Sequence, residues 1–384
     1  MTEAAIIGGG IAGTAMALAL HKIGVRTRIY ESYPRETVET GGALMTLWPN
    51  GMHALDQLGV RDRIEAASPE LHTVRAFGAD GVQRAELPMG QRHPPLPGFR
   101  YLLRGTLNRT LHDAVLDLGI PVLHDKRLAA IERAGGKPRL GFTDGARTDT
   151  ELLIGADGAH SHVRRFVDEQ APAARYTGER VVYGTSTEPS ARHELSMYSG
   201  PRTTFGHAGV PDGGSWWFCR VQDEHAERPE LTEKLESYVL AALTEHAGDL
   251  GRFVRASTVI AANNTWDMHD LPNWHAGGDT MLVGDAAHAT SPAAAQGASL
   301  AIEDAVMFAK CLRDLPEEAF PAYERLRRAR ANRIVHGGSV NASRDPDRQR
   351  RDPADKQRWL YEYPLDWGIP VTKALAEQVE ASQQ

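Results

Sequence analysis

The apolar positions of this chain fall into two kinds of pattern. Residues 4–7 form a short apolar run that ends in three glycines, and apolar positions at helical spacing then continue to Ile23. This order predicts a buried strand, a tight turn and a helix. A second strand-like run covers residues 25–30, and short apolar runs at 152–154 and 280–283 are each followed by glycine and aspartate. Such runs are typical of the buried strands of a parallel sheet.

The middle of the chain has a different pattern. Between residues 176 and 222, strand-like runs are separated by proline and glycine turns, which predicts an antiparallel sheet. The runs cover residues 180–187, 194–199, 203–210 and 215–221. Apolar residues at helical spacing indicate helices within residues 99–119, 230–250 and 297–312.

We therefore expect an α/β fold class: a Rossmann-like nucleotide-binding domain with an inserted antiparallel β-sheet substrate domain and C-terminal helices. The expected boundaries are 1–75, 99–175 and 266–335 for the discontinuous nucleotide-binding domain, 76–98 and 176–265 for the sheet domain, and 336–384 for a C-terminal helical tail.

Composition narrows the classes of protein. The 384 residues are 41% hydrophobic and 24% charged, and the net charge of −7 argues against a nucleic-acid partner. Two cysteines cannot build a disulfide framework or a cysteine zinc site, which fits the cytoplasm, and the histidines show no metal-ligand pattern. No apolar stretch reaches about 18 residues, so we expect no stable membrane association. The arginine-rich segment 325–333 is interpreted as a solvated helix face.

The glycine turn near the N-terminus carries the clearest chemical signal. Gly8 permits a tight turn, Gly10 lets a pyrophosphate approach the backbone, and Gly13 lets the helix pack on the strand. Glu31 follows 18 residues after Gly13, at the end of the second strand, where a carboxylate can accept ribose hydroxyls. Together these features predict dinucleotide binding.

A second glycine-rich segment points to a flavin. Asp285 follows a strand, where its carboxylate can accept hydroxyls of a polyol chain. Gly297 and Ala298 then open a helix whose small residues allow close approach to a flat ring. The positive end of that helix would stabilise negative charge on the ring.

Over residues 1–335 the chain resembles the single-component FAD-dependent aromatic hydroxylases, the para-hydroxybenzoate hydroxylase-like flavoprotein monooxygenases. Three motifs carry the resemblance: Gly8–Gly13 with Glu31, residues 155–161 with Arg164, and Gly284-Asp285 with Pro292, Gln296 and Gly297. Weaker matches are Gly42-Ala43, Pro49-Asn50, Arg104 and Ile302-Glu303-Asp304. The chain departs from the family pattern at Ala295, where glycine is usual, and at Ser299, where asparagine is common.

The resemblance implies FAD as cofactor, NADPH or NADH as transient co-substrate, and molecular oxygen as a reactant. A flavin hydroperoxide would hydroxylate or epoxidise a small, largely apolar aromatic or olefinic molecule. The expected cofactor-binding residues are Gly8, Gly10, Gly13, Glu31, Gly42, Ala43, Arg104, Asp157, Asp285, Pro292, Gly297 and Ala298.

Such chemistry needs a closed, apolar substrate pocket. The candidate substrate contacts are Met45, Leu47, Met197, Phe205, His207 and Trp217. We also consider Pro292 and His207 as catalytic candidates, the latter as a base that deprotonates a phenol. Trp216 and Trp217 must point to opposite faces of their strand, and the sequence does not choose between them.

Two alternatives stay open on sequence alone. The same fold could serve a flavin-dependent reductase or oxidase that inserts no oxygen. It could also serve a flavoprotein whose FAD is structural and which binds a ligand. The state of assembly, monomer or homodimer, and the identity of the small-molecule substrate are equally open.

Overall fold

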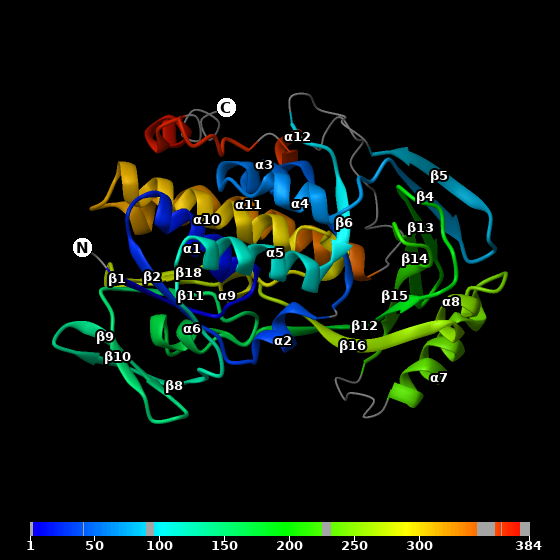
Figure 1. The fold of residues 1–384 in the computed structure, drawn as a ribbon, viewed down its shortest axis with the longest axis horizontal. Helices are drawn as coiled ribbons and strands as arrows, with labels where there is room; N and C mark the ends of the chain where they lie inside the picture. Colours follow the sequence, from blue (N-terminus) through cyan, green and yellow to red (C-terminus); the bar gives the residue numbers. More distant parts are fainter. Residues whose placement is uncertain are drawn as a thin grey trace.

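The computed structural model describes residues 3–40, 42–89, 96–224, 232–343, 358–361 and 363–376 (Figure 1). Its helices, with two 3₁₀ turns η1 and η2, are α1 (Ile11–Lys22), α2 (Arg35–Glu39), α3 (Pro49–Gln57), α4 (Arg61–Ala67), α5 (Arg104–Asp117), α6 (His162–Val167), α7 (Thr232–Ala242), η1 (Leu243–Glu245), α8 (Gly251–Arg255), α9 (Asp285–His288), η2 (Pro292–Ala294), α10 (Gly297–Asp314), α11 (Ala319–Ser343) and α12 (Arg358–Tyr361).

Its strands form four sheets. They are β1 (Glu3–Ile7), β2 (Arg26–Tyr30), β3 (Leu44–Leu47), β4 (Thr73–Gly78), β5 (Gln83–Pro88), β6 (Arg100–Leu103), β7 (Val122–Leu123), β8 (Leu128–Ala134), β9 (Lys137–Phe142), β10 (Arg147–Asp149), β11 (Leu152–Gly155), β12 (Arg175–Ser186), β13 (Glu194–Ser199), β14 (Thr203–Gly209), β15 (Ser215–Gln222), β16 (Ser257–Asp267), β17 (His275–Ala276) and β18 (Thr280–Leu282).

A six-stranded sheet in the order β17-β18-β11-β1-β2-β7 forms the centre of the first half of the molecule. Its strands are parallel apart from the β17–β18 pair. In the register, Ile7 lies beside Gly155, and Gly155 lies beside Leu282. The three glycine-containing turns that follow β1, β11 and β18 therefore meet at one edge of the sheet, which is where parallel sheets bind ligands.

Helix α1 explains how this edge is held in place. Its residues from Gly13 to Leu20 are all buried, so it is apolar on every side. A helix of that kind needs protein all around it. It packs against α10 and α5 on one face of the sheet, while α6 and the three-stranded sheet β10-β9-β8 lie on the other face (Figure 1).

The second half of the molecule is a seven-stranded sheet in the order β16-β12-β15-β14-β13-β4-β5. Most neighbours are antiparallel, as the sequence pattern predicts, but β4 pairs with β13 in parallel. Strands β4 and β5 reach this sheet from residues 73–88, far from the rest of it in sequence, and the long connection allows the parallel pairing.

Helices α7 and α8 cover the face of this sheet that points away from the nucleotide-binding half (Figure 1). They enclose a second apolar core that is separate from the main one, with Phe205, Trp217 and Phe253 among its fully buried members. The opposite face of the sheet packs toward the main core. The two faces of this sheet therefore belong to different apolar cores.

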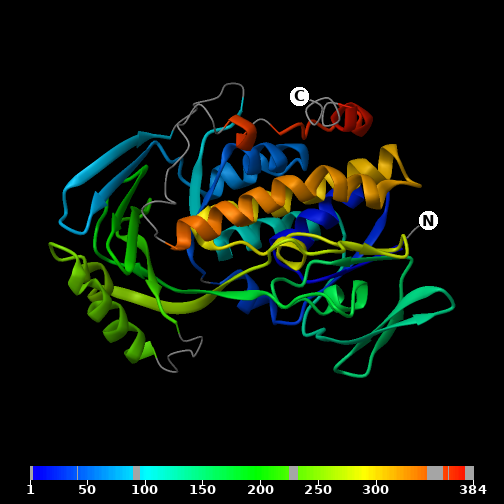
Figure 2. The same cartoon turned by 180° about the vertical axis from the view of Figure 1, so that it is seen from behind.

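The C-terminal segment docks back on the body, as expected from its apolar residues. Helix α11 runs along much of the molecule (Figure 2). Beyond it, Leu360 and Tyr361 are buried, and Lys310 Nζ of α10 donates to the Asp366 carbonyl at 2.7 Å. Within the described residues, no helix is both long enough and apolar enough to cross a membrane.

Candidate active site

The turn between β1 and α1 is built from glycines, which leave its backbone without side chains. Gly8 has φ +104°, and a Cβ there would lie 2.3 Å from the Ala156 carbonyl oxygen. A Cβ on Gly13 would lie 1.9 Å from the Gly8 oxygen, so only glycine lets α1 pack this closely on the strand. At Gly10, by contrast, a Cβ would meet no atom within 4 Å. This open space at the start of α1 is suited to a phosphate group.

Glu31 sits beside this turn at the end of β2, with only 6% of its surface exposed. One carboxylate oxygen accepts from the Gly9 N–H at 2.6 Å and the other from the Tyr33 N–H at 2.9 Å. The oxygen bound by Tyr33 also accepts from the Ser32 hydroxyl at 3.3 Å, whereas the oxygen bound by Gly9 keeps a further lone pair that can accept a sugar hydroxyl. His112, which no sequence motif indicated, lies with Nε2 at 2.6 Å from the Gly9 carbonyl oxygen and braces the same turn.

The second turn is organised by Asp157. Its carboxylate accepts from the Ser161 hydroxyl at 2.5 Å and from the His162 N–H at 2.7 Å. Burial raises the pKa of this carboxyl, and these hydrogen bonds oppose the rise. Both oxygens thus serve the start of α6, so Asp157 shapes the turn that packs against Gly8. Direct contact between Asp157 and the cofactor stays a prediction.

Arg164 joins the second turn to the third. Its guanidinium donates to the Ala159 carbonyl at 2.6 Å and to the Ala286 carbonyl at 3.0 Å, and its side chain is buried. Because Ala286 follows Asp285 directly, this one side chain fixes the spacing between two motifs that lie far apart in the sequence.

Asp285 is the least satisfied polar group of the site. Among the described residues its carboxylate has no hydrogen-bond partner, and it is reached by solvent although protein surrounds it closely. This desolvation raises the pKa of Asp285, and the positive charge of Arg104 opposes the rise. Arg104 begins α5, and its N–H donates to the Ala43 carbonyl at 3.1 Å, beside Gly42 with φ +100°. The residues 42–43 and 104 are thereby brought to Asp285.

Helix α10 begins at Gly297 and Ala298, and both are only partly buried. The turn before it contains Pro292, which is exposed, and Ala295, which has φ +52°. That left-handed conformation favours glycine, which is why the family pattern has glycine at this place. The alanine keeps the shape of the turn at the expense of some strain.

Three polar atoms near the start of α10 are buried without a hydrogen-bond partner in the part of the chain that the structure describes. They are Asn50 Oδ1, Gln296 Nε2 and Ser299 Oγ. Asn50 comes from α3, and its amide donates to Gln296 Oε1 at 3.0 Å. Buried polar atoms are seldom left unpaired, and these three are covered by the surrounding protein.

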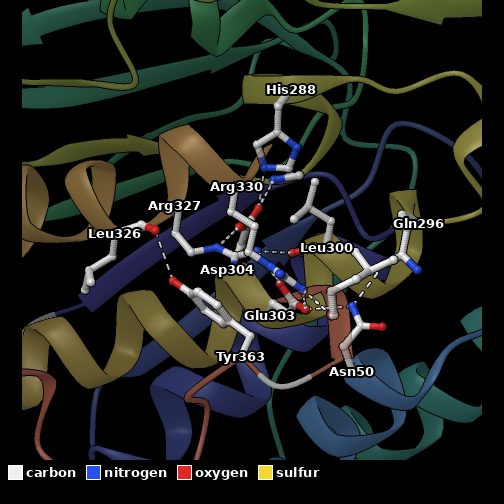
Figure 3. Close-up of polar contacts among 12 residues, drawn as sticks. Asn50, His288, Gln296, Leu300, Glu303, Asp304, Leu326, Arg327, Arg330 and Tyr363 are labelled. Carbon is white, nitrogen blue, oxygen red and sulfur yellow. Dashed lines mark hydrogen bonds and ion pairs between the residues drawn. The ribbon is translucent and has the colours of Figure 1, made fainter. Parts of the chain in front are cut away.

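A buried charged network supports the third turn from behind (Figure 3). Asp304 of α10 accepts from the Gly284 N–H at 2.9 Å, from His288 Nε2 at 2.6 Å and from Arg327 Nε at 2.8 Å. Burial alone would raise the pKa of Asp304, but His288 and Arg327 lower it to about 2. The ionised carboxylate therefore anchors the backbone next to Asp285.

The neighbouring Glu303 carries the network to α11 and α3. Its carboxylate pairs with Arg330 at 2.7 Å and with Arg327 at 2.7 Å, and accepts from Asn50 Nδ2 at 2.6 Å. Arg327 is fully buried and Arg330 nearly so. The interpretation of residues 325–333 as a solvated helix face is therefore wrong for these two arginines, because two buried carboxylates on α10 face them.

The seven-stranded sheet decides which candidate substrate contacts can face the site. Phe205 and Trp217 are fully buried in the core against α7 and α8, on the face that points away from the nucleotide-binding half. His207 lies on the same face as its cross-strand neighbour Trp217. The structure therefore places these three residues on the face away from the nucleotide-binding half, which argues against the predicted contact with substrate. Alternation along a strand shows that neighbouring residues point to opposite faces of the sheet. Only the packing of α7 and α8 shows which of these faces is covered by helices.

His207 is a structural residue. Its ring stacks on Phe253 of α8 with centroids 4.2 Å apart, and its Nδ1 is 2.7 Å from the Ser190 hydroxyl. Burial lowers the pKa of His207 to about 4, helped by the charge of Arg252. An imidazole held in this position faces α8 and not the nucleotide-binding half, which argues against its predicted role as a base.

The opposite face of the sheet carries the side chains that can meet substrate. Trp216 and Phe218 of β15 and Met197 of β13 are partly buried and pack toward the main core. Met45 of β3 does the same, and β3 lies beside β15. Leu47, also on β3, is fully buried in the main core and is not available to a ligand. Of the six candidates, Met45 and Met197 lie on this side, together with Trp216 and Phe218, and their contact with substrate stays a prediction.

Comparison with known proteins agrees with this geometry. Residues 1–337 match the FAD binding domain family. The chain belongs to the FAD-dependent aromatic hydroxylases. It is 32% identical to the 3-amino-4-hydroxybenzoate 2-monooxygenase of Streptomyces cremeus over 97% of both chains. It is 27% identical to the FAD-dependent urate hydroxylase of Klebsiella oxytoca over 98% of both chains.

The fold is shared with solved members of this family. The structure of Klebsiella pneumoniae HpxO complexed with FAD and uric acid superimposes with a TM-score of 0.78 at 22% identity, covering 99% of this chain and 96% of that one. The protein is an FAD-dependent monooxygenase that consumes NAD(P)H, which sets aside the alternatives of a reductase, an oxidase or a flavoprotein that only binds a ligand.

The residues of this hydroxylase fit FAD. The space over Gly10 and the exposed, unpartnered carboxylate of Asp285 are open to a ligand. Asp285 lies between the starts of two helices: a Cβ on Gly284 would lie 2.9 Å from Ala12 of α1, and a Cβ on Gly297 of α10 would lie 4.0 Å from Asp285 Oδ1. When bound, FAD supplies the oxygen-activating redox chemistry, and the protein supplies position and electrostatics. The positive end of α10 stabilises negative charge at its N-terminus, and Asp304 and Glu303 hold that helix in place.

Proposed function

We propose that this monooxygenase hydroxylates a small aromatic ring that already carries a hydroxyl or amino group. The observation that carries the proposal is the site-facing side of the sheet, where Trp216, Phe218 and Met197 present a flat apolar surface opposite Met45. A planar ring packs well on such a surface. The relatives support the class, since their names give 3-amino-4-hydroxybenzoate and urate as the compounds they act on.

Hydroxyl and amino substituents suit the chemistry because they donate electrons to the ring and make it more reactive toward an electrophilic oxygen. In the proposed reaction one atom of O₂ replaces the hydrogen of a ring C–H bond as a hydroxyl group. The other atom leaves as water, and NAD(P)H provides the two electrons. Epoxidation of an olefin would need no such substituents, and hydroxylation is therefore the reaction we propose.

The protein's own part is to place FAD and to keep water away. We propose that Glu31 binds the adenosine ribose, that the turn at Gly10 binds the pyrophosphate, and that Asp285 binds the ribityl chain. The isoalloxazine would lie against Pro292 and the start of α10. The apolar sheet face would then cover the ring and exclude water, which protects a reactive oxygen species from unproductive decay.

The test uses the FAD-loaded enzyme with NADH or NADPH and a panel of ring compounds. The panel contains aminohydroxybenzoates, hydroxybenzoates, hydroxypyridines and purines, with benzoate and styrene as members that lack activating groups or offer an olefin. Under ¹⁸O₂, mass spectrometry should find one ¹⁸O in the product of an activated ring. Turnover of styrene to its oxide, with no hydroxylation of any activated ring, would contradict the proposal.

A further inference from the structure

A cluster of two histidines and one aspartate lies outside the flavin site. His269 and Asp270 follow the end of β16, and His336 lies on α11. One ring nitrogen of each histidine and one carboxylate oxygen of Asp270 are all within 4.8 Å of one another. The two imidazole rings meet edge to face, with centroids 4.7 Å apart and planes at 81°.

The contacts of His269 all fall on one of its two ring nitrogens, Nε2. Nε2 lies 3.1 Å from Asp267 Oδ2 and 2.9 Å from the Ser339 hydroxyl oxygen. Ser339 donates its own hydrogen to Asp267 Oδ2 at 2.7 Å. Arg175 Nη2, which can only donate, also lies 3.2 Å from Nε2, so Nε2 meets both donors and acceptors, while Nδ1 has no hydrogen-bond partner among the described residues.

Hydrogen bonds to neighbouring groups also orient His336 and Asp270. His336 Nδ1 lies 2.8 Å from the Asn332 carbonyl, which can only accept, so Nδ1 carries the hydrogen and Nε2 the lone pair. Asn332 Nδ2 donates to Asp270 Oδ1 at 2.6 Å. The second oxygen, Oδ2, faces His336 Nε2 at 3.4 Å. Two acceptors that face each other at this distance favour a cation between them.

These second partners are those found around protein metal sites. A ligating histidine usually donates its other N–H to a carboxylate or a backbone carbonyl, which fixes the ring and its tautomer. Here Asp267 serves His269, and the Asn332 carbonyl serves His336. Arg175 pairs with Asp267 through both arms of its guanidinium, at 3.0 and 2.8 Å, and its Nη2 also lies 3.2 Å from His269 Nε2. The pair is neutral, and Asp270 leaves a local negative charge.

We propose that His269, Asp270 and His336 bind one divalent transition-metal ion, with Zn²⁺ the best match. Two imidazoles and one carboxylate are ligands that Zn²⁺ accepts readily, and the partial exposure of Asp270 and His336 leaves room for water at the fourth position. The ion would cross-link α11 to the segment that follows β16.

This position gives the ion a defined consequence. The adjacent Met268 N–H donates to the Ala289 carbonyl at 2.8 Å, within the turn that leads from α9 to η2. A metal cross-link here would join the last strand of the substrate sheet to the helix that supports the flavin site. We therefore expect bound Zn²⁺ to stabilise the folded enzyme, because an ion that binds only the folded state shifts the folding equilibrium toward it.

The test uses tag-free, FAD-loaded enzyme from which metals have been removed with a chelator. Calorimetric titration with Zn²⁺, and absorption spectra of the Co²⁺ form, should show one ion per chain and a raised thermal midpoint. His336→Ala should weaken Zn²⁺ binding at least tenfold, and Asp270→Asn should weaken it while leaving the FAD content unchanged. His21→Ala, which removes an exposed histidine at the end of α1, is the matched control.

Two results would overturn the proposal. One is the absence of saturable Zn²⁺ binding to the wild-type enzyme at up to millimolar concentration, which would make the cluster an ordinary His336–Asp270 ion pair. The other is binding that His336→Ala and Asp270→Asn both leave unchanged. The Co²⁺ spectrum separates a histidine site from loose carboxylate binding, because nitrogen ligands and low coordination number intensify the visible bands.

Discussion

At the scale of single residues, the site depends on which polar atoms have partners. Asp157 uses both carboxylate oxygens to accept from the Ser161 hydroxyl and from backbone N–H groups, whereas Asp285 has no hydrogen-bond partner among the described residues. A satisfied carboxylate shapes a turn, and an unsatisfied one is available to a ligand. The same distinction separates His207, enclosed between Ser190 and Phe253, from a catalytic base.

Asp285→Asn should weaken FAD binding. A hydrogen bond to a charged acceptor contributes about 1.5–3 kcal/mol, so the dissociation constant should rise roughly ten- to hundredfold. Titration of the apoenzyme with FAD, followed by flavin fluorescence, measures this without reference to turnover. Asp212→Asn changes an exposed turn residue and should have no effect. An unchanged FAD affinity in the Asp285 variant would show that the carboxylate does not contact the cofactor.

His207→Gln should change the pH dependence of stability and leave that of turnover alone. The folded pKa of His207 is about 4 against an ordinary 6.5, so the folded state resists protonation. Stability is therefore complete above about pH 6.5 and falls as pH decreases toward 4, by about 3 kcal/mol from this group. Urea unfolding between pH 7 and 4 should show a shallower decline in the variant. A shifted pH profile of turnover would restore a catalytic role for His207.

At the scale of elements, the start of α10 is positioned by two charged layers behind it. Asp304 fixes the turn at Gly284, and Glu303 ties α10 to Asn50 of α3 and to Arg330 of α11. Arg330 also donates to the carbonyls of Trp359 and Leu360, at 2.8 and 2.7 Å. Through this one side chain, the C-terminal segment contacts the network that holds the flavin site.

Arg330→Met should destabilise the protein by about 3–5 kcal/mol, because it leaves part of a buried ion pair uncompensated. The midpoint of urea unfolding of the FAD-loaded enzyme measures this. Arg109→Met, at an exposed position of α5, should cost less than about 0.5 kcal/mol. Equal effects of the two substitutions would mean that the Glu303–Arg330 contact adds nothing to stability.

At the scale of the whole molecule, the two large sheets contribute different parts of the site. The parallel sheet gathers three turns at one edge, and the seven-stranded sheet presents an apolar face to them. The far face is closed by α7 and α8, so the substrate sheet has a core of its own. Neighbouring residues on one strand consequently belong to different parts of the protein.

The adjacent pair Trp216 and Trp217 tests this division. Trp216→Phe should raise KM for the ring substrate and increase the hydrogen peroxide formed per NAD(P)H, because it reduces the apolar surface that covers the site. Trp217→Phe should lower the thermal midpoint, since Trp217 is fully buried and donates to the Ser257 hydroxyl at 2.8 Å, with KM unchanged. A raised KM in Trp217→Phe, with KM unchanged in Trp216→Phe, would show that Trp217 and not Trp216 lies on the substrate side of the sheet.

The sequence alone was sufficient wherever the signal is local. The turn at Gly8, the strands at 194–199 and 203–209 and the start of α10 at Gly297 follow from residue types at short spacing, because dihedral freedom and periodicity depend on near neighbours. The class of enzyme also followed from such motifs, in their order along the chain.

Only the tertiary structure decided which groups are buried, and beside what. Trp216 and Trp217 are equivalent in any sequence pattern, and packing of α7 and α8 on one face of the sheet places Trp217 in their core, while Trp216 packs against the main core. Arg327 resembles its exposed neighbours until Glu303 and Asp304 are placed opposite it. Burial and pairing are properties of two segments together, so they are set by packing between parts of the chain that are distant in sequence.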